Sequence, residues 1–150
     1  MEIEEICKKY RAGLKEKIRL LDRFKQATAK TKAALEAEDT RQIHLHLKER
    51  QGIIHRIERI DKGVDDLVQA NGFSIEMLSG KARELFRGYF DQIKTFLESI
   101  SAVDNECLEL ARAERDRLKS EILRVRRGYR VTRGYRPKRH QTARFLDLKR

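Results

Sequence analysis

Apolar residues recur every three or four positions along most of this chain, which is the spacing of one face of an α-helix. The first such run begins at Ile3, and a polar break follows at Glu38, Asp39 and Thr40. Asp39 or Thr40 is a candidate N-cap of the next helix, because a short side-chain oxygen can accept a bond from a free amide of the first turn. We therefore predict a first helix over about residues 2–37.

The second run has an apolar face wider than a two-stranded seam. Its stripe and the residues that flank it are Ile43, Leu47, Ile53, Ile54, Ile57, Ile60, Val64, Leu67 and Val68. A face of this width indicates packing against more than one neighbour. We predict this helix over about residues 40–70 and expect Gly72 to end it in the left-handed conformation. Residues 73–80 then form a connector, with room for a helical turn, that covers one end of a bundle.

The third run is the longest, and we predict a helix over about residues 80–127. Its apolar positions are Phe86, Tyr89, Ile93, Phe96, Ile100, Val103, Cys107 and Leu110, followed after a shift at Glu114 by Leu118, Ile122 and Val125. Such a helix is on the order of 70 Å long at about 1.5 Å per residue, so it outruns its partners. From about Leu110 onward the other helices leave its stripe incompletely covered, and an uncovered stripe is a partner site.

These runs predict an all-α protein, an antiparallel three-helix bundle or coiled-coil hairpin with a long C-terminal helix. The helical part covers residues 1–127, and residues 128–150 form a flexible basic tail. Composition agrees, because 39% of the residues are charged and 39% are hydrophobic, with a single proline and no tryptophan.

The positive charge of the chain is concentrated at its C-terminal end. Residues 126–150 contain ten Lys and Arg against one acidic residue, whereas the other 125 residues contain 25 basic and 23 acidic ones. The basic end also repeats the tetrapeptide Arg-Gly-Tyr-Arg, at residues 127–130 and 133–136. Basic and aromatic side chains in alternation are typical of segments that bind nucleic acid.

Catalytic signatures do not occur in this sequence. It has no glycine-rich phosphate loop, no nucleophile elbow and no kinase or dinucleotide motif. His44, His46 and His55 lack the spacing of four that lets two imidazoles reach one metal, and Cys7 and Cys107 lie far apart. No apolar run approaches the roughly 20 residues that span a bilayer. We expect a cytoplasmic protein that is no enzyme, binds no cofactor or metal and does not insert into a membrane.

The C-terminal tail has three interpretations. It is a disordered basic extension that binds polyanions weakly, a specific nucleic-acid site, or a docking segment for a protein surface. The last depends on Phe145 and the residues Leu146, Asp147 and Leu148 that follow it, an apolar patch that a purely electrostatic tail does not need. The stripe of the third helix likewise has an alternative interpretation, as the seam of a homodimeric, structural coiled coil.

In layout the whole chain resembles the flagellar type III export chaperones of the FlgN kind, with the FliT chaperones as a looser match. The resemblance starts with two amphipathic helices that end in an Asn71-Gly72 turn, followed by a connector. A long helix then contains Asn105-Glu106 within AVDNECLEL, and Gly-Tyr pairs lie at 128–129 and 134–135. The terminal ARFLDLKR is similar to the Phe-hydrophobic-Asp-Lys ending of that family.

This resemblance implies a cytoplasmic chaperone that binds the C-terminal helix of a hook–filament junction protein. The chaperone prevents early assembly of that cargo and delivers it to the export gate. Recognition would place the amphipathic cargo helix on the stripe of the long helix. The cargo site implied here is Val103, Cys107, Leu110, Leu118, Ile122 and Val125. Family members contact the gate through a tyrosine near the end of the long helix, which matches Tyr129 or Tyr135, and we add Phe145 as a docking residue.

Overall fold

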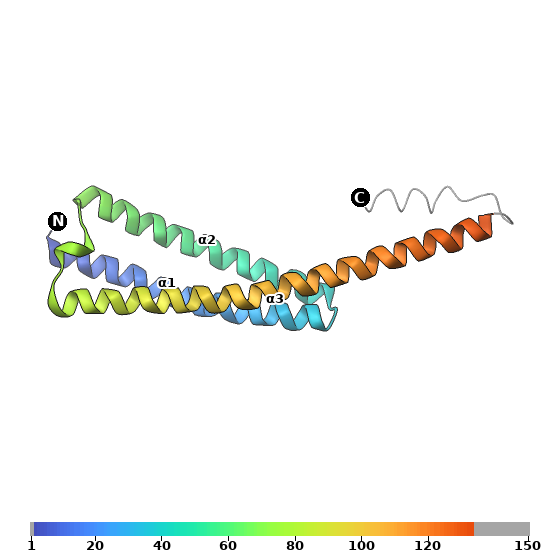
Figure 1. Ribbon diagram of the computed structural model, residues 1–150. Helices are drawn as coiled ribbons and strands as arrows, with labels where there is room; N and C mark the ends of the chain where they lie inside the picture. The colour runs from blue at the N-terminus through green and yellow to red at the C-terminus, as the bar shows by residue number, and fades with distance from the viewer. Residues whose placement is uncertain (1, 134–150) are drawn as a thin grey trace. The chain divides into compact units, whose positions relative to one another are not determined.

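The computed structural model describes residues 2–133, which form three α-helices and one short 3-10 helix. Helix α1 spans Ile3–Glu36, α2 spans Thr40–Asn71, η1 spans Ile75–Met77 and α3 spans Gly80–Arg133 (Figure 1). The all-α prediction is confirmed. The chain divides into two units, residues 1–110 and residues 111–150, and each unit is described separately below.

Both connections of unit 1 follow the predicted cap chemistry. The carboxylate of Asp39 accepts a bond from the amide of Gln42 at 3.2 Å, which makes Asp39 the N-cap of α2. Gly72 ends α2 with φ 57° and ψ 31°, the left-handed conformation expected of it. In the connector, Ser74 caps η1 by accepting a bond from the amide of Glu76.

Contacts between side chains fix the directions of the helices in unit 1. Lys17 of α1 lies 2.7 Å from Asp61 of α2, and the ring of Phe24 lies 4.8 Å from the guanidinium of Arg50, so α1 and α2 are antiparallel. Helix α3 is parallel to α1 and antiparallel to α2 (Figure 1). Its Phe86 and Cys107 lie against Tyr10 and Thr28 of α1, and its Asp104 pairs with Arg50 of α2.

Helix α1 supplies most of the buried core of unit 1. Leu20, Ala27 and Thr28 have no exposed surface, and the buried Thr28 hydroxyl is satisfied because it donates to the Phe24 carbonyl at 2.8 Å. Helix α3 contributes its regular stripe, including Phe86 and Ile100. Helix α2 buries only Ile53 to the same degree, and its other apolar residues are half-buried or exposed.

An aromatic cluster closes the end of unit 1 where η1 crosses. The ring of Tyr10 lies 5.9 Å from Phe73, 5.2 Å from Phe86 and 6.5 Å from Phe90. The guanidinium of Arg11 donates to the Tyr89 hydroxyl at 3.0 Å. The connector therefore covers the bundle end, as its sequence predicted.

Helix α3 is six residues longer than predicted, since it continues past residue 127 to Arg133. Gly128 does not end it, because a single glycine costs only about 1 kcal/mol in a helix and this one does not adopt the left-handed backbone that ends many helices. The predicted tail boundary at 128 is therefore wrong for residues 128–133. The remainder of that tail, residues 134–150, lies outside the described part of the chain.

Candidate functional site

The titratable side chains of residues 2–133 do not cluster as metal ligands. No group of three or more His, Cys, Asp or Glu within that range is arranged to hold a metal ion. Two of the described histidines lie beside glutamates of their own helix, with His46 Nδ1 3.5 Å from Glu49 and His55 Nδ1 3.5 Å from Glu58. These are ordinary pairs along α2 at a spacing of three residues.

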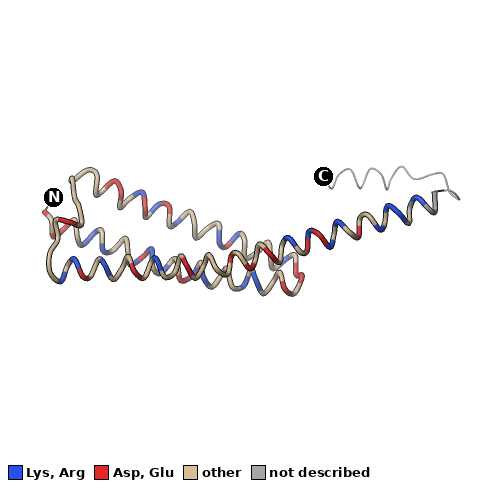
Figure 2. The backbone as a smooth tube through the Cα atoms, in the orientation of Figure 1, with Lys and Arg blue, Asp and Glu red and all other residues tan. Residues whose placement is uncertain are grey.

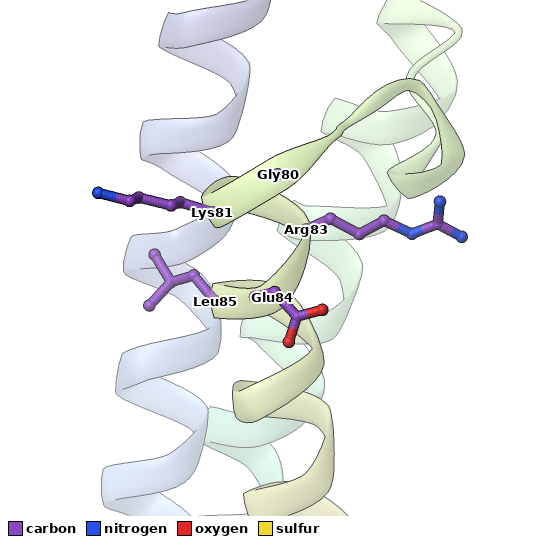
Figure 3. Close-up of a pocket in the computed structure, with 5 residues that line it drawn as sticks. All are labelled: Gly80, Lys81, Arg83, Glu84 and Leu85. Carbon is purple, nitrogen blue, oxygen red and sulfur yellow. The ribbon is translucent and has the colours of Figure 1, made fainter.

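The charged side chains that line a hollow at the start of α3 do not point toward one another. It is lined by Gly80, Lys81, Arg83, Glu84 and Leu85, all from the first turns of the helix. Figure 3 shows Lys81 and Arg83 extending away from each other on opposite sides of the helix. Two cations that point apart cannot hold one anion, so the hollow is part of an ordinary surface.

A small apolar groove lies where the three helices of unit 1 meet, with a volume of about 230 Å³. Its lining includes Leu21, Phe24, Ile54, Ile57, Leu97 and Ile100. Leu97 is 51% exposed, and the Lys17–Asp61 ion pair stands at the rim. The groove is smaller than the roughly 300 Å³ at which small-molecule sites begin, so its size fits an aliphatic side chain better than a cofactor.

The half of the predicted cargo site that falls in unit 1 is largely internal. Cys107 is only 5% exposed, and its Sγ lies 3.9 Å from the Thr28 carbonyl. Val103 and Leu110 are half-buried on the same face of α3. Cys107 is therefore a core residue in this structure, and its contact with a cargo helix stays a prediction. Helix α1 covers this face of α3. Near the end of α1, Lys32 forms an ion pair with Glu106 of α3, the residue next to Cys107.

Burial has the expected effect on the Cys107 thiol. Removal from water raises the pKa of Cys107, and the neighbouring carboxylate of Asp104 raises it further, because both disfavour the thiolate. The opposing influence of Arg50 and Lys32 is smaller. A thiol held protonated is a weak nucleophile and a poor metal ligand, which agrees with a packing role.

The half of the predicted cargo site in unit 2 has a different environment. Leu118 is 46% exposed, Val125 is 54% exposed and Ile122 is half-buried. These three residues, spaced by four and three positions, form one face of the helix, and we call them the apolar strip. The heptad phase shifts at Glu114, close to the boundary between the units at residue 110. The strip lies wholly within unit 2.

One flank of the apolar strip carries a fixed ion-pair network. Arg117 donates to Glu114 at 2.5 Å and to Glu121 at 2.7 Å. The bonds and charge of Arg117 lower the pKa of Glu114 below its ordinary value, so this carboxylate stays ionised at neutral pH. The network stabilises the helix on that flank and leaves the apolar side chains uncovered.

The predicted gate-docking residues are described only in part. The backbone of Tyr129 belongs to α3, because the helix continues to Arg133. Tyr135 and Phe145 lie outside the described residues. Their role in docking stays a prediction.

The exposed apolar residues beside the core stripe of α3 were not predicted from the sequence. Phe90, Leu97 and Leu108 are 37%, 51% and 48% exposed, respectively, and Leu123 in unit 2 is also exposed. The sequence contains a pattern that predicts Phe90 and Leu97. They follow the core positions Phe86 and Ile93 by four residues, and this spacing widens the apolar face of α3. The wide apolar face of α2, which was recognised, forms the opposite wall of the groove through Ile54 and Ile57.

The described helices and the comparisons with known proteins give two further findings. None of the helices in the described residues is long and apolar enough to cross a bilayer. Comparison with protein-family models, with curated proteins and with solved structures finds no match to this chain.

Proposed function

We propose that this protein is an export chaperone that binds an amphipathic helix of its cargo on the apolar strip of α3. The cargo is the C-terminal helix of a hook–filament junction-type protein, and the chaperone delivers it to the type III export gate. The observation that carries the proposal is the exposure of Leu118 and Val125 on a regular helix. A helix with an uncovered apolar face is the surface that helix-in-groove recognition uses.

The core of unit 1 is built from other residues than the proposed cargo site. This unit has its own core around Leu20 and Phe86 and its own aromatic end cluster, and neither includes a residue of the strip. The strip can therefore bind and release a partner without exposing the core. This separation is what a chaperone requires, since the cargo must leave at the gate.

Nucleic-acid binding is the second candidate function. It is favoured by the charge of residues 111–150, which contain 15 Lys and Arg against four Asp and Glu. Phosphate contacts made by such a segment would weaken steeply with salt. The two functions differ in the need for the apolar strip, which phosphate contacts do not use.

The test is affinity capture of the tagged protein from its own cells at about 150 mM salt, where exposed charges are screened beyond roughly 8 Å. Wild type should retain a stoichiometric hook-junction or filament-cap protein. The variant Leu118→Ser should lose it, whereas Leu45→Ser, a change at an exposed leucine of unit 1, should retain it. Recovery of nuclease-sensitive RNA or DNA with no stoichiometric protein would overturn the proposal.

A further inference from the structure

The two units differ sharply in charge. Residues 1–110 contain 20 basic and 20 acidic residues, so unit 1 has no net charge. Residues 111–150 contain 15 basic and four acidic residues, so the whole formal net charge of +11 belongs to unit 2. Figure 2 shows this change along α3, where basic residues become frequent toward Arg133.

Within the described part of unit 2 the basic residues follow helical spacing. Arg112, Arg115, Lys119, Arg126 and Arg130 are separated by three, four, seven and four positions, which places them on one side of α3. We call these five residues the basic ladder. It extends over the 19 residues from Arg112 to Arg130, or about 27 Å of helix.

The basic ladder borders the apolar strip on the flank opposite Glu114 and Glu121. Lys119 lies three positions before Ile122, and Arg126 lies four positions after it. At these spacings side chains on a helix are neighbours. A partner helix that covers the strip therefore contacts the ladder along one of its own edges.

The charges of the basic ladder are available to a partner. Arg112, Lys119 and Arg130 are exposed and Arg126 is half-buried, and none of these four has an ion-pair partner among residues 2–133. Arg115 contacts only the adjacent Asp116, at 3.2 Å, within that range. On the other flank, by contrast, Arg117 already engages Glu114 and Glu121. The exposed charge beside the strip is thus positive on one side and internally compensated on the other.

We propose that the partner of the apolar strip is an acidic amphipathic helix, whose carboxylates lie along the edge that faces the basic ladder. This inference rests on the proposed function and adds the chemistry of the bound segment. Opposite charges along the edge of a helix pair set partner choice and orientation, and they speed the encounter of the two chains.

Arg115 also predicts how the partner helix is aligned on the strip. It precedes Leu118 by three positions, so it occupies the preceding heptad position on the same face of α3. A partner residue that faces Arg115 is partly desolvated by the pairing, and an uncompensated cation there is costly. The partner helix therefore carries Asp or Glu at the position that faces Arg115, which is one helical turn away from the position that faces Leu118.

A second copy of this chain fits the same face poorly. Parallel pairing on the strip would place Arg115 opposite Arg115 of the copy, and each unit 2 carries a net charge of +11. Like charges at a seam position are repulsive. Charge complementarity therefore favours an acidic helix over a homodimer.

A nucleic acid would contact the basic ladder but not the apolar strip. Glu114, Asp116 and Glu121 lie among the first turns of unit 2 and repel phosphate, and the exposed leucine and valine side chains contribute nothing to phosphate contacts. An acidic amphipathic helix engages both the ladder and the strip.

The test measures binding of two designed helical peptides by fluorescence anisotropy to the full chain. Both contain about three heptads with Leu and Ile at the seam, and the edge positions carry Glu in one peptide and Gln in the other. The Glu peptide should bind about tenfold more tightly than the Gln peptide at about 50 mM salt, and salt should reduce the difference.

Matched variants locate the effect. The triple variant Arg115→Glu, Lys119→Glu and Arg126→Glu should lose the preference for the Glu peptide. The variant Lys30→Glu, Arg59→Glu and Lys62→Glu has the same change in charge at exposed positions of unit 1 and should keep it. Circular dichroism of each variant checks that the helices remain.

The outcomes separate this inference from the proposed function. Equal binding of both peptides, lost in each case with Leu118→Ser, overturns the acidic partner but leaves helix recognition by the strip intact. Binding of neither peptide, or ladder-dependent binding of single-stranded RNA in their place, also overturns the inference. So does a dimer of the free protein that Leu118→Ser dissociates, since a second copy would then occupy the strip.

Discussion

Gly13 of α1 lies so close to Val64 of α2 that a Cβ atom at residue 13 would stand 2.7 Å from Val64 Cγ2. The absence of a side chain at Gly13 therefore sets how closely the two helices approach. This contact lies near the Lys17–Asp61 ion pair, which joins the same two helices. Close approach at this point stabilises the α1–α2 hairpin against which α3 packs.

The first prediction concerns this close approach. Gly13→Ala should lower the free energy of unfolding by about 1 to 3 kcal/mol, because Val64 is β-branched and cannot move its methyl group without leaving its rotamer. Gly63 is the matched control, since it lies in α2 and a Cβ atom at residue 63 would have no neighbour within 4 Å. Gly63→Ala should raise the free energy of unfolding by about 0.5 to 1 kcal/mol, the usual gain in a helix. Urea unfolding measures both.

A double variant tests the cause of the Gly13 effect. Val64→Ala removes the methyl group that the new Cβ would meet, so Gly13→Ala should cost less in that background than in wild type. Equal costs in the two backgrounds would show that the contact with Val64 is not responsible.

The second prediction concerns Arg50 and Asp104, whose side chains lie 2.8 Å apart between α2 and α3. Asp104→Ala should cost about 1 to 2 kcal/mol, because it leaves a guanidinium that is only 15% exposed without its carboxylate. Glu5→Ala, which breaks the exposed Lys9–Glu5 pair, should cost less than about 0.5 kcal/mol. Similar costs for the two changes would contradict the importance of burial at Arg50.

Replacing Arg50 itself should have a smaller effect than removing its partner. Arg50→Met keeps an unbranched chain against Phe24 and removes a buried Nε that has no hydrogen-bond partner among the described residues. We expect a change in unfolding free energy within about 1 kcal/mol. A loss larger than that of Asp104→Ala would mean that the cation itself, through its contact with the Phe24 ring, stabilises the bundle.

The third prediction is a dependence of stability on pH through Cys107. Because burial raises the pKa of Cys107, the folded protein holds this proton more tightly than the unfolded chain does. The resulting stability is present below the ordinary thiol pKa of 9.0 and is lost as the pH rises through the folded value. Between about pH 8 and pH 10 wild type should therefore lose more unfolding free energy than Cys107→Ala does. Equal losses would contradict burial of the thiol.

The fourth prediction separates binding from stability along the same chain. Leu118→Ala should change the free energy of unfolding by less than about 0.5 kcal/mol, because its side chain is exposed. Leu20→Ala removes a side chain with no exposed surface and should cost about 2 to 5 kcal/mol. Only the Leu118 change should weaken cargo binding at temperatures where both proteins are folded. Loss of stability in Leu118→Ala would mean that the strip is packed within the protein.

The fifth prediction concerns residues 134–150. A chain that ends at Arg133 keeps the ladder, the strip and all the contacts of unit 1, so its thermal stability and its cargo binding should equal those of the full chain. Delivery should fall, because Tyr135 and Phe145 are removed. Secretion of cargo and its level inside the cell report delivery. Loss of cargo binding on truncation would place part of the cargo site in residues 134–150.

Much of the fold follows from local signals in the sequence. Asp39 begins a helix and Gly72 ends it for reasons contained in a few residues, and the spacing of three and four residues in α3 is unbroken through its bundled part. The end of α3 was misjudged because glycine lowers helix propensity at Gly128 without forbidding the helical conformation.

The candidate site was harder to predict, because periodicity identifies an apolar face and does not show which helix covers it. Cys107 and Leu118 belong to one apparent stripe in the sequence, yet Cys107 is buried against α1 and Leu118 is exposed. The cover over Cys107 comes from the last turns of α1, where Lys32 pairs with Glu106, and this long-range contact has no local signal in the sequence. The groove around Leu97 depends on the spacing of α2 from α3, which no local pattern encodes.

Hydrogen–deuterium exchange of residues 111–133, with and without the C-terminal helix of the captured cargo, shows whether the cargo covers the apolar strip. We expect slower exchange around Leu118, Ile122 and Val125 when that peptide is added, and no change in the core of unit 1 around Leu20. The protection should be absent in Leu118→Ser. Binding that protects only unit 1, or leaves residues 111–133 unchanged, would contradict the proposal that the apolar strip holds the cargo.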